Sequence, residues 1–118
     1  MHFQICDPYS FWWPVTVSLP DPDRPGELCQ QDFEGKFLMT SHEQLAELES
    51  EGQEQLISTI LTDWRNVHDE DGNPAPFSGE ALRKCLPYQH FRIAVYRAYL
   101  SALNGQAAPN GHGARAKN

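Results

Sequence analysis

Two early segments of the chain alternate apolar and polar side chains, which is the pattern of half-buried β-strands. The apolar positions are Trp13, Val15, Val17 and Leu19 in the first segment, and Phe33, Gly35, Phe37 and Met39 in the second. Between them, residues 20–26 contain three prolines, which cannot donate to a sheet, so we expect a hairpin loop. Pro14 favours an edge strand or a strand beginning, and Gly35 indicates a bulge or a close approach of backbone.

The pattern then changes to helical spacing, and about four helices are expected. Thr40 and Glu43 form a capping box at the start of the first helix, which Gly52 ends or kinks. An apolar stripe predicts a second helix, with one side made of Leu56, Ile57, Ile60, Leu61, Trp64 and Val67. Ser78 has the position of an N-cap for the third helix. Pro87 ends that helix and suits the first turn of the next.

The last helix, Tyr88–Leu103, is apolar over more than half of its circumference. Such a helix is either central to the fold or partly covered by a partner. Asn104 and Gly105 have the character of a C-cap. We predict one α+β domain over residues 1–104, in which an N-terminal β-hairpin, with room for a third strand, packs on about four α-helices. Residues 105–118 lack periodicity and are expected to form a disordered tail.

Charge is distributed unevenly along the 118 residues, whose net charge is −7. All 16 carboxylate side chains lie in residues 1–80, whereas residues 81–118 hold six of the nine lysines and arginines. This division can hold two parts of one fold together, align copies of the chain head to tail, or mark a nucleic-acid surface on the basic half. Three scattered cysteines, no secretory leader and no apolar run of about 20 residues favour a soluble intracellular protein.

Residues 68–82, HDEDGNPAPFSGEAL, contain the oxygen ligands of a calcium-binding EF-hand loop. The first, third, fifth and twelfth positions of that loop would be Asp69, Asp71, Asn73 and Glu80. The sixth position must turn sharply and requires glycine, but Pro74 stands there with its φ fixed near −65°. We therefore expect an acidic turn and no calcium site.

Other candidates for chemistry are weaker. The five histidines include no pair at the spacing of a zinc-binding helix, and a proline break separates Cys85 from His90. The sequence contains no phosphate-binding glycine loop, dinucleotide fingerprint or nucleophile motif. We predict no enzymatic activity, no metal and no cofactor.

One longer pattern resembles a known family. It consists of the strand hairpin, FEGKFLMTSHEQLAEL, TDWRNVHDEDGNPAPFSGEALRKCL and the aromatic last helix PYQHFRIAVYRAYLSAL. The order is similar to small tail assembly chaperones of long-tailed bacteriophages and prophages, over roughly residues 12–104. The matching motif residues are Phe33, Phe37, Trp64, Val67, Asp69, Glu70, Asp71, Gly72, Pro74, Pro76, Phe77 and Ser78. The opening HFQICDPYSFWW and the proline-rich loop do not match.

The resemblance implies a helper of virus assembly in the bacterial host cytoplasm, absent from the mature virion. Such proteins coat the tape-measure protein and keep it soluble until tail-tube subunits assemble around it. Residues expected to pack in the core or contact these partners are Trp64, Phe77, Tyr88, Phe91, Tyr96 and Tyr99. Arg92 and Arg97 are expected to be exposed and to steer an acidic partner. Self-association would suit the hairpin edge, and many members have a longer frameshifted form, which would begin near Gln106.

A function from another class stays open at this point. The basic C-terminal half could belong to a small phage-encoded DNA-binding regulator, with Arg92 and Arg97 on phosphates. The two helices around Pro87 invite comparison with a helix-turn-helix, but the second is aromatic and aliphatic where a recognition helix is polar. The acidic half would also repel DNA. Neighbouring tail-tube and tape-measure genes would favour assembly, and a neighbouring repressor gene would favour regulation.

Overall fold

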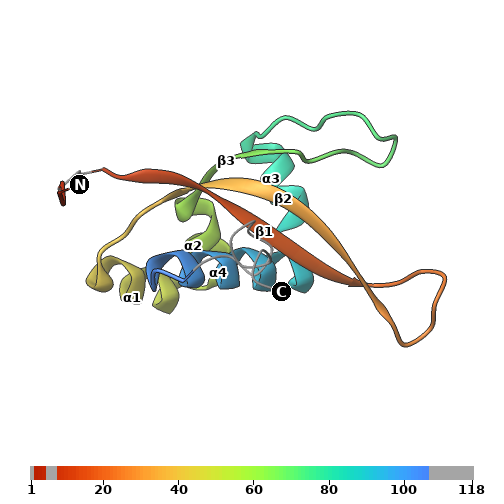
Figure 1. Ribbon diagram of the computed structural model, residues 1–118, viewed down its shortest axis with the longest axis horizontal. Helices are drawn as coiled ribbons and strands as arrows, with labels where there is room; N and C mark the ends of the chain where they lie inside the picture. The colour runs from red at the N-terminus through yellow and green to blue at the C-terminus, as the bar shows by residue number, and fades with distance from the viewer. Residues whose placement is uncertain (1, 5–7, 107–118) are drawn as a thin grey trace.

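The structure, a computed structural model, describes residues 2–4 and 8–106. Its elements in chain order are β1 (Ser10–Pro20), β2 (Leu28–Leu38), α1 (His42–Glu51), α2 (Gln53–Ile60), β3 (Leu61–Arg65), α3 (Gly79–Cys85) and α4 (Gln89–Leu103). The strands form one antiparallel sheet in the order β1-β2-β3, and α1, α2 and α4 lie along one side of the long β1–β2 ribbon (Figure 1). The predicted α+β class is confirmed, with a third strand and four helices. The predicted disordered tail lies, from residue 107 onward, outside the described residues.

β1 and β2 form a hairpin in which both strands have 11 residues and pair over their full length. The amide of Met39 donates to the carbonyl of Tyr9 at 2.8 Å, so the odd-numbered residues of β1 direct their hydrogen-bonding groups to β2. Pro14 and Pro20 occupy even-numbered positions that point away from β2, where a missing N–H breaks no ladder bond. The edge position predicted for Pro14 is confirmed.

Gly35 is buried at the point where β2 meets β3. A Cβ added to Gly35 would lie 2.8 Å from Leu61 Cδ1, which is closer than two such atoms can approach. The pairing of β2 with β3 also shifts register between Lys36 and Phe37, next to this glycine. Of the two alternatives predicted from Gly35, the irregularity in pairing is found nearby, whereas the atoms that crowd Gly35 belong to side chains and not to backbone.

The second helix ends earlier than predicted, at Ile60, and β3 follows it directly. The helical prediction, which extended to Val67, is therefore wrong for residues 61–67. Leu61 and Trp64 are buried in the strand, as they would have been on the inner side of a helix, so the apolar spacing did not distinguish the two. β3 instead gains backbone partners along β2, with Arg65 opposite Glu34. This distant pairing overrides the local helical preference.

The capping box of α1 lies one residue later than predicted. Ser41 Oγ accepts the amide hydrogen of Gln44 at 3.1 Å, and Gln44 Oε1 accepts that of Ser41 at 2.9 Å. Thr40 and Glu43 are therefore not the pair. The hydroxyl of Thr40 lies 2.8 Å from the hydroxyl of Tyr99, 59 residues away. The Thr40 side chain, which was predicted to cap the helix, is instead bound to Tyr99.

The remaining helix ends follow their sequence signals closely. Ser78 caps α3, accepting the amide hydrogen of Ala81 at 3.0 Å. Gly52 separates α1 from α2 with a φ of 111°. Gly105 follows α4 with a φ of 71°, which is the conformation of a helix C-terminus that favours glycine. Pro87 departs from prediction, because it precedes the N-cap of α4 and stands outside the first turn.

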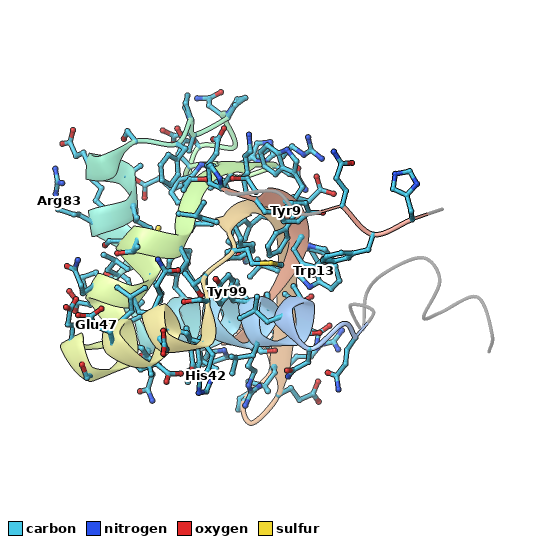
Figure 2. All side chains as sticks on the ribbon, turned by 90° about the vertical axis from the view of Figure 1, so that its left-hand side faces the viewer. Tyr9, Trp13, His42, Glu47, Arg83 and Tyr99 are labelled. Carbon is cyan, nitrogen blue, oxygen red and sulfur yellow. The ribbon has the colours of Figure 1, made fainter. Side chains whose placement is uncertain are left out.

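The core lies between the sheet and the helices, and Tyr99 is its largest fully buried side chain. The ring centroid of Tyr99 lies 5.5 Å from that of Phe37, and α4 packs chiefly against β1 (Figure 2). The other fully buried side chains are Val15, Phe37, Leu56, Ile57, Ile60, Leu61 and Val95. The apolar last helix buries Phe91, Ala94, Val95 and Tyr99 in this core.

Candidate interaction groove

An open groove of about 560 Å³ lies between the far half of the β1–β2 hairpin, the segment after β3, and α3 with the start of α4. Below it is called the hairpin groove. Its apolar lining is Val17, Leu19, Phe33, Trp64, Val67, Tyr88 and Phe91. Asp32, Asp69, Lys84 and His90 also line it. A concave apolar surface with a few polar groups is the usual form of a binding site.

Aromatic contacts make the floor of the hairpin groove. The ring of Phe33 is stacked on that of Phe91, with centroids 6.0 Å apart and an interplanar angle of 4°. The Trp64 ring meets Phe33 edge-on at 6.3 Å. These three side chains are buried, whereas Tyr88 at the rim is 58% exposed. The floor is therefore fixed by packing within the chain, and Tyr88 is available to a ligand.

The segment after β3 holds Trp64 in this position. Trp64 Nε1 donates to the carbonyl of Ala75 at 2.7 Å, and the Phe77 ring lies edge-on to the indole at 5.0 Å. Residues 68–74 close into a small hairpin through a bridge between His68 and Pro74. Residues 64–78 thus form one structural unit that borders the groove.

The acidic turn is organised by Asp69. Its Oδ1 accepts the backbone amide hydrogens of Asp71 and Asn73, both at 2.9 Å. Gly72 has a φ of 82°, which explains a glycine in the turn. These bonds direct one carboxylate oxygen of the apparent calcium loop at the backbone. Within residues 2–4 and 8–106, no group of three or more acidic, histidine or cysteine side chains is placed to hold a metal ion.

Four of the eight predicted partner-binding residues lie in or behind the hairpin groove. Trp64, Tyr88 and Phe91 line it, and half-buried Phe77 supports Trp64. Tyr99 is elsewhere, in the core, where its hydroxyl donates to the carbonyl of Leu38. The structure therefore gathers part of the predicted set into one surface.

The other three predicted residues lie on α4 outside the groove, with Arg92 and Tyr96 one helical turn apart. The hydroxyl of Tyr96 donates to Glu49 of α1. Arg92, expected to be exposed, is half-buried, and it donates to Gln53 Oε1 at 3.0 Å and to the Leu86 carbonyl at 2.6 Å. These bonds tie Arg92 to its own fold, which corrects that expectation. Arg97 is exposed, as predicted.

Arg97 borders a second, smaller depression of about 360 Å³ between β1 and α4. Trp13 lines the same depression, and its Nε1 is buried without a hydrogen-bond partner, alone among the buried side-chain nitrogens and oxygens of the described residues. Trp12 lies on the other face of the ribbon, where Arg65 Cζ is 4.0 Å from the centre of a Trp12 ring. Neither tryptophan therefore adds to the hairpin groove.

Val17, Leu19 and Phe33 were not predicted as groove residues. Their alternation along the strands identifies the inward face of the sheet, but it does not show which part of that face other elements leave uncovered. The missing signal was the unequal length of the strands. β2 has 11 residues and β3 has five, so the far half of the hairpin extends past its neighbour. Only the correct assignment of β3 would have exposed that mismatch.

Cys85 lines the groove and is half-buried. Burial raises the pKa of the Cys85 thiol above its usual 9.0, so the side chain is a neutral thiol near pH 7. Cys85 consequently contributes an apolar surface to the wall of the groove.

No helix in the described part of the chain is long and apolar enough to cross a membrane. No family model, curated protein or solved structure matches this chain.

Proposed function

We propose that this chain is a phage tail assembly chaperone that binds the tape-measure protein and helps to recruit tail-tube subunits. The proposal starts from the sequence resemblance. The observation that carries it further is the position of the motif, whose residues from Trp64 to Ser78 build and brace one wall of the hairpin groove. A motif that shapes a binding surface is compatible with a helper protein whose work is to cover another chain.

The groove has the properties that such work requires. Its floor is apolar and fixed, its volume of about 560 Å³ is open to the surface, and exposed Tyr88 offers a large contact area. Binding of this kind needs no covalent step. On this proposal the protein acts in the bacterial host cytoplasm and is absent from the mature virion.

Coexpression tests the proposal directly. The tape-measure protein should give a higher soluble yield when it is coexpressed with this chain than without it. Tyr88→Ala removes the exposed ring from the groove rim and should lower that yield, because the contact area of the ring is lost. Tyr9→Ala is the matched control, since Tyr9 is 47% exposed and is not part of the groove lining.

The two variants separate binding from folding. Both should melt close to the parent chain, because both tyrosines are exposed. An unchanged soluble yield of the tape-measure protein with and without the parent chain would contradict the proposal. Salt-sensitive retention of the chain on DNA in the same extracts would favour a DNA-binding regulator.

A further inference from the structure

β2 has an unpaired edge beside the hairpin groove. β3 pairs with β2 only over Glu34–Phe37, and Asn66, with a φ of 65°, then leads the chain away. Across residues 8–106, no strand pairs with this side of β2 from Leu28 to Gln31. A strand added there would lie in line with β3. Unpaired edges of this kind accept extended segments of other proteins.

The backbone groups of Leu28 and Gln30 point toward that open edge. They stand opposite Pro20 and Ser18 of β1, at the even-numbered positions that exchange no ladder bonds between the two strands. Both side chains are exposed, and Leu28 is 68% exposed. Two adjacent outward positions present two N–H donors and two carbonyl acceptors to an incoming chain.

The groove lies where the side chains of an added strand would point. Side chains alternate between the two faces of a sheet, so every second one would face the helix side. On that side Val17, Leu19 and Phe33 form the hairpin wall of the groove. The open edge and the apolar groove are therefore two parts of one surface, one for the backbone and one for alternate side chains.

Two acidic loops extend at the same end of the molecule as this surface (Figure 1). The hairpin turn carries Asp21, Asp23 and Glu27 against the single cation Arg24. The segment after β3 carries Asp69, Glu70 and Asp71 and has no lysine or arginine up to Ser78. Lys84 in the groove lining offsets only part of this negative charge. The remaining excess of carboxylates favours a positively charged ligand and raises its rate of encounter.

We propose that the hairpin groove binds an extended basic segment of a partner protein as an added strand along Leu28–Gln30, with alternate apolar side chains in the groove. This inference rests on the proposed function for the existence of a client protein. It adds the conformation and the charge of the client segment, which the proposed function leaves unspecified.

A fluorescein-labelled peptide of alternating valine and lysine tests the inference on the full chain by fluorescence anisotropy. Gln30→Pro removes the outward N–H of Gln30 and should weaken peptide binding by about tenfold or more, since lost hydrogen bonds of about 1.5 kcal/mol reduce affinity by that factor. Ser18→Pro is the matched control. Ser18 stands directly opposite, at an equally outward position on the other edge, and this variant should bind like the parent chain.

Three further measurements decide the mode of binding. A peptide with glutamate in place of lysine should bind at least tenfold more weakly. Glu70→Lys should reduce this difference in affinity between the two peptides and should leave the open edge of β2 unchanged. Amide hydrogen exchange at Leu28 and Gln30 should slow when the basic peptide is added. Equal weakening by Gln30→Pro and Ser18→Pro, equal binding of both peptides, or unchanged exchange would each overturn the inference.

The peptide titration tests strand addition and the coexpression experiment tests the proposed client, so either proposal can be refuted without the other. A tape-measure protein that stays soluble with the Gln30→Pro variant as well as with the parent would refute strand addition and leave the proposed function standing. Peptide binding that is sensitive to Gln30→Pro, without any effect on the tape-measure protein, would support strand addition and refute the proposed client. Thermal melting of each proline variant tests whether the fold is retained. We expect that it is, because Pro14 and Pro20 already occupy outward positions in β1.

Discussion

The hydroxyl of Tyr99 in α4 donates to the carbonyl of Leu38 at the end of β2, at a distance of 2.8 Å and across 61 residues of sequence. The same hydroxyl lies 2.8 Å from that of Thr40. One phenol thus joins the last helix to the end of the hairpin and to the residue before the N-cap of α1. It fixes the position of α4, whose first residues form one wall of the hairpin groove.

Removing this hydroxyl should weaken the whole fold. Tyr99→Phe leaves the Leu38 carbonyl without its donor in a largely buried place, and we expect a loss of about 1–3 kcal/mol in the free energy of unfolding. Urea denaturation followed by tryptophan fluorescence measures the change. Tyr88→Phe serves as the control, because Tyr88 is 58% exposed, and should leave stability within about 0.5 kcal/mol of the parent. Equal effects of the two substitutions would contradict the assigned role of Tyr99.

Gly35 should tolerate no side chain. Gly35→Ala would place a Cβ 2.8 Å from Leu61 Cδ1, and relieving that overlap should reduce stability by about 1–3 kcal/mol. Leu61→Ala in the same chain should recover part of the loss, which a double-mutant cycle detects as a coupling between the two sites. Gly79→Ala is the control, since its Cβ would have 3.4 Å to the nearest side-chain atom. Strict additivity of the two substitutions would show that the close approach is absent.

The contact between α1 and α4 should make stability depend on pH in the alkaline range. The hydrogen bond from Tyr96 to Glu49, together with burial and the carboxylate charge, raises the pKa of Tyr96 from 10.0 to about 12. Because the pKa is higher in the folded state, the contact contributes fully below pH 10 and its contribution is lost as the pH rises toward about 12.

Ultraviolet difference absorbance measures this titration. Glu49→Gln should return the pKa of Tyr96 toward 10.0, while Tyr96→Phe should remove one late-titrating phenol from the spectrum. Tyr99 also titrates late, because burial raises its pKa, so the difference between the parent and Tyr96→Phe isolates the signal of Tyr96. An identical titration curve for the parent and Glu49→Gln would contradict the assignment.

The acidic turn should depend on Asp69 far more than on Asp71. Asp69→Ala removes the acceptor of two backbone amides, and we expect a loss of about 1–2 kcal/mol and faster proteolysis near Gly72. Asp71 supplies its backbone amide to this bond, so Asp71→Ala should stay near the parent. Melting temperatures with calcium and with a chelator should coincide. A rise in melting temperature on adding calcium would support the rejected EF-hand interpretation.

Local chemistry predicted much of this fold, because caps, turns and alternation act within a few residues. Ser78, Gly52 and Gly105 stand where their backbone preferences place them, and the hairpin follows its alternating residues. The predictions were wrong where a contact with a residue far away in the sequence determines the local structure. β3 satisfies a helical spacing and still pairs with β2 as a strand, and Thr40 leaves the cap to meet Tyr99.

The candidate site was predictable only in part. Trp64, Tyr88 and Phe91 were selected for their aromatic side chains, and the structure places them around one groove. Arg92 was selected as an exposed cation, but its guanidinium group donates hydrogen bonds to Gln53 and to the carbonyl of Leu86. An edge of the hairpin was expected, but the part of β2 that stays open could not be predicted, because it follows from the difference in length between β2 and β3.

The two prolines of β1 limit what can be built on this sheet. Pro14 and Pro20 withhold two outward donors from the far edge, so β1 offers an interrupted template to any further strand. A chain captured along β2 would complete that side, and the opposite side would not recruit another. Complexes formed through the sheet should accordingly hold one added strand per chain and should not grow into fibrils.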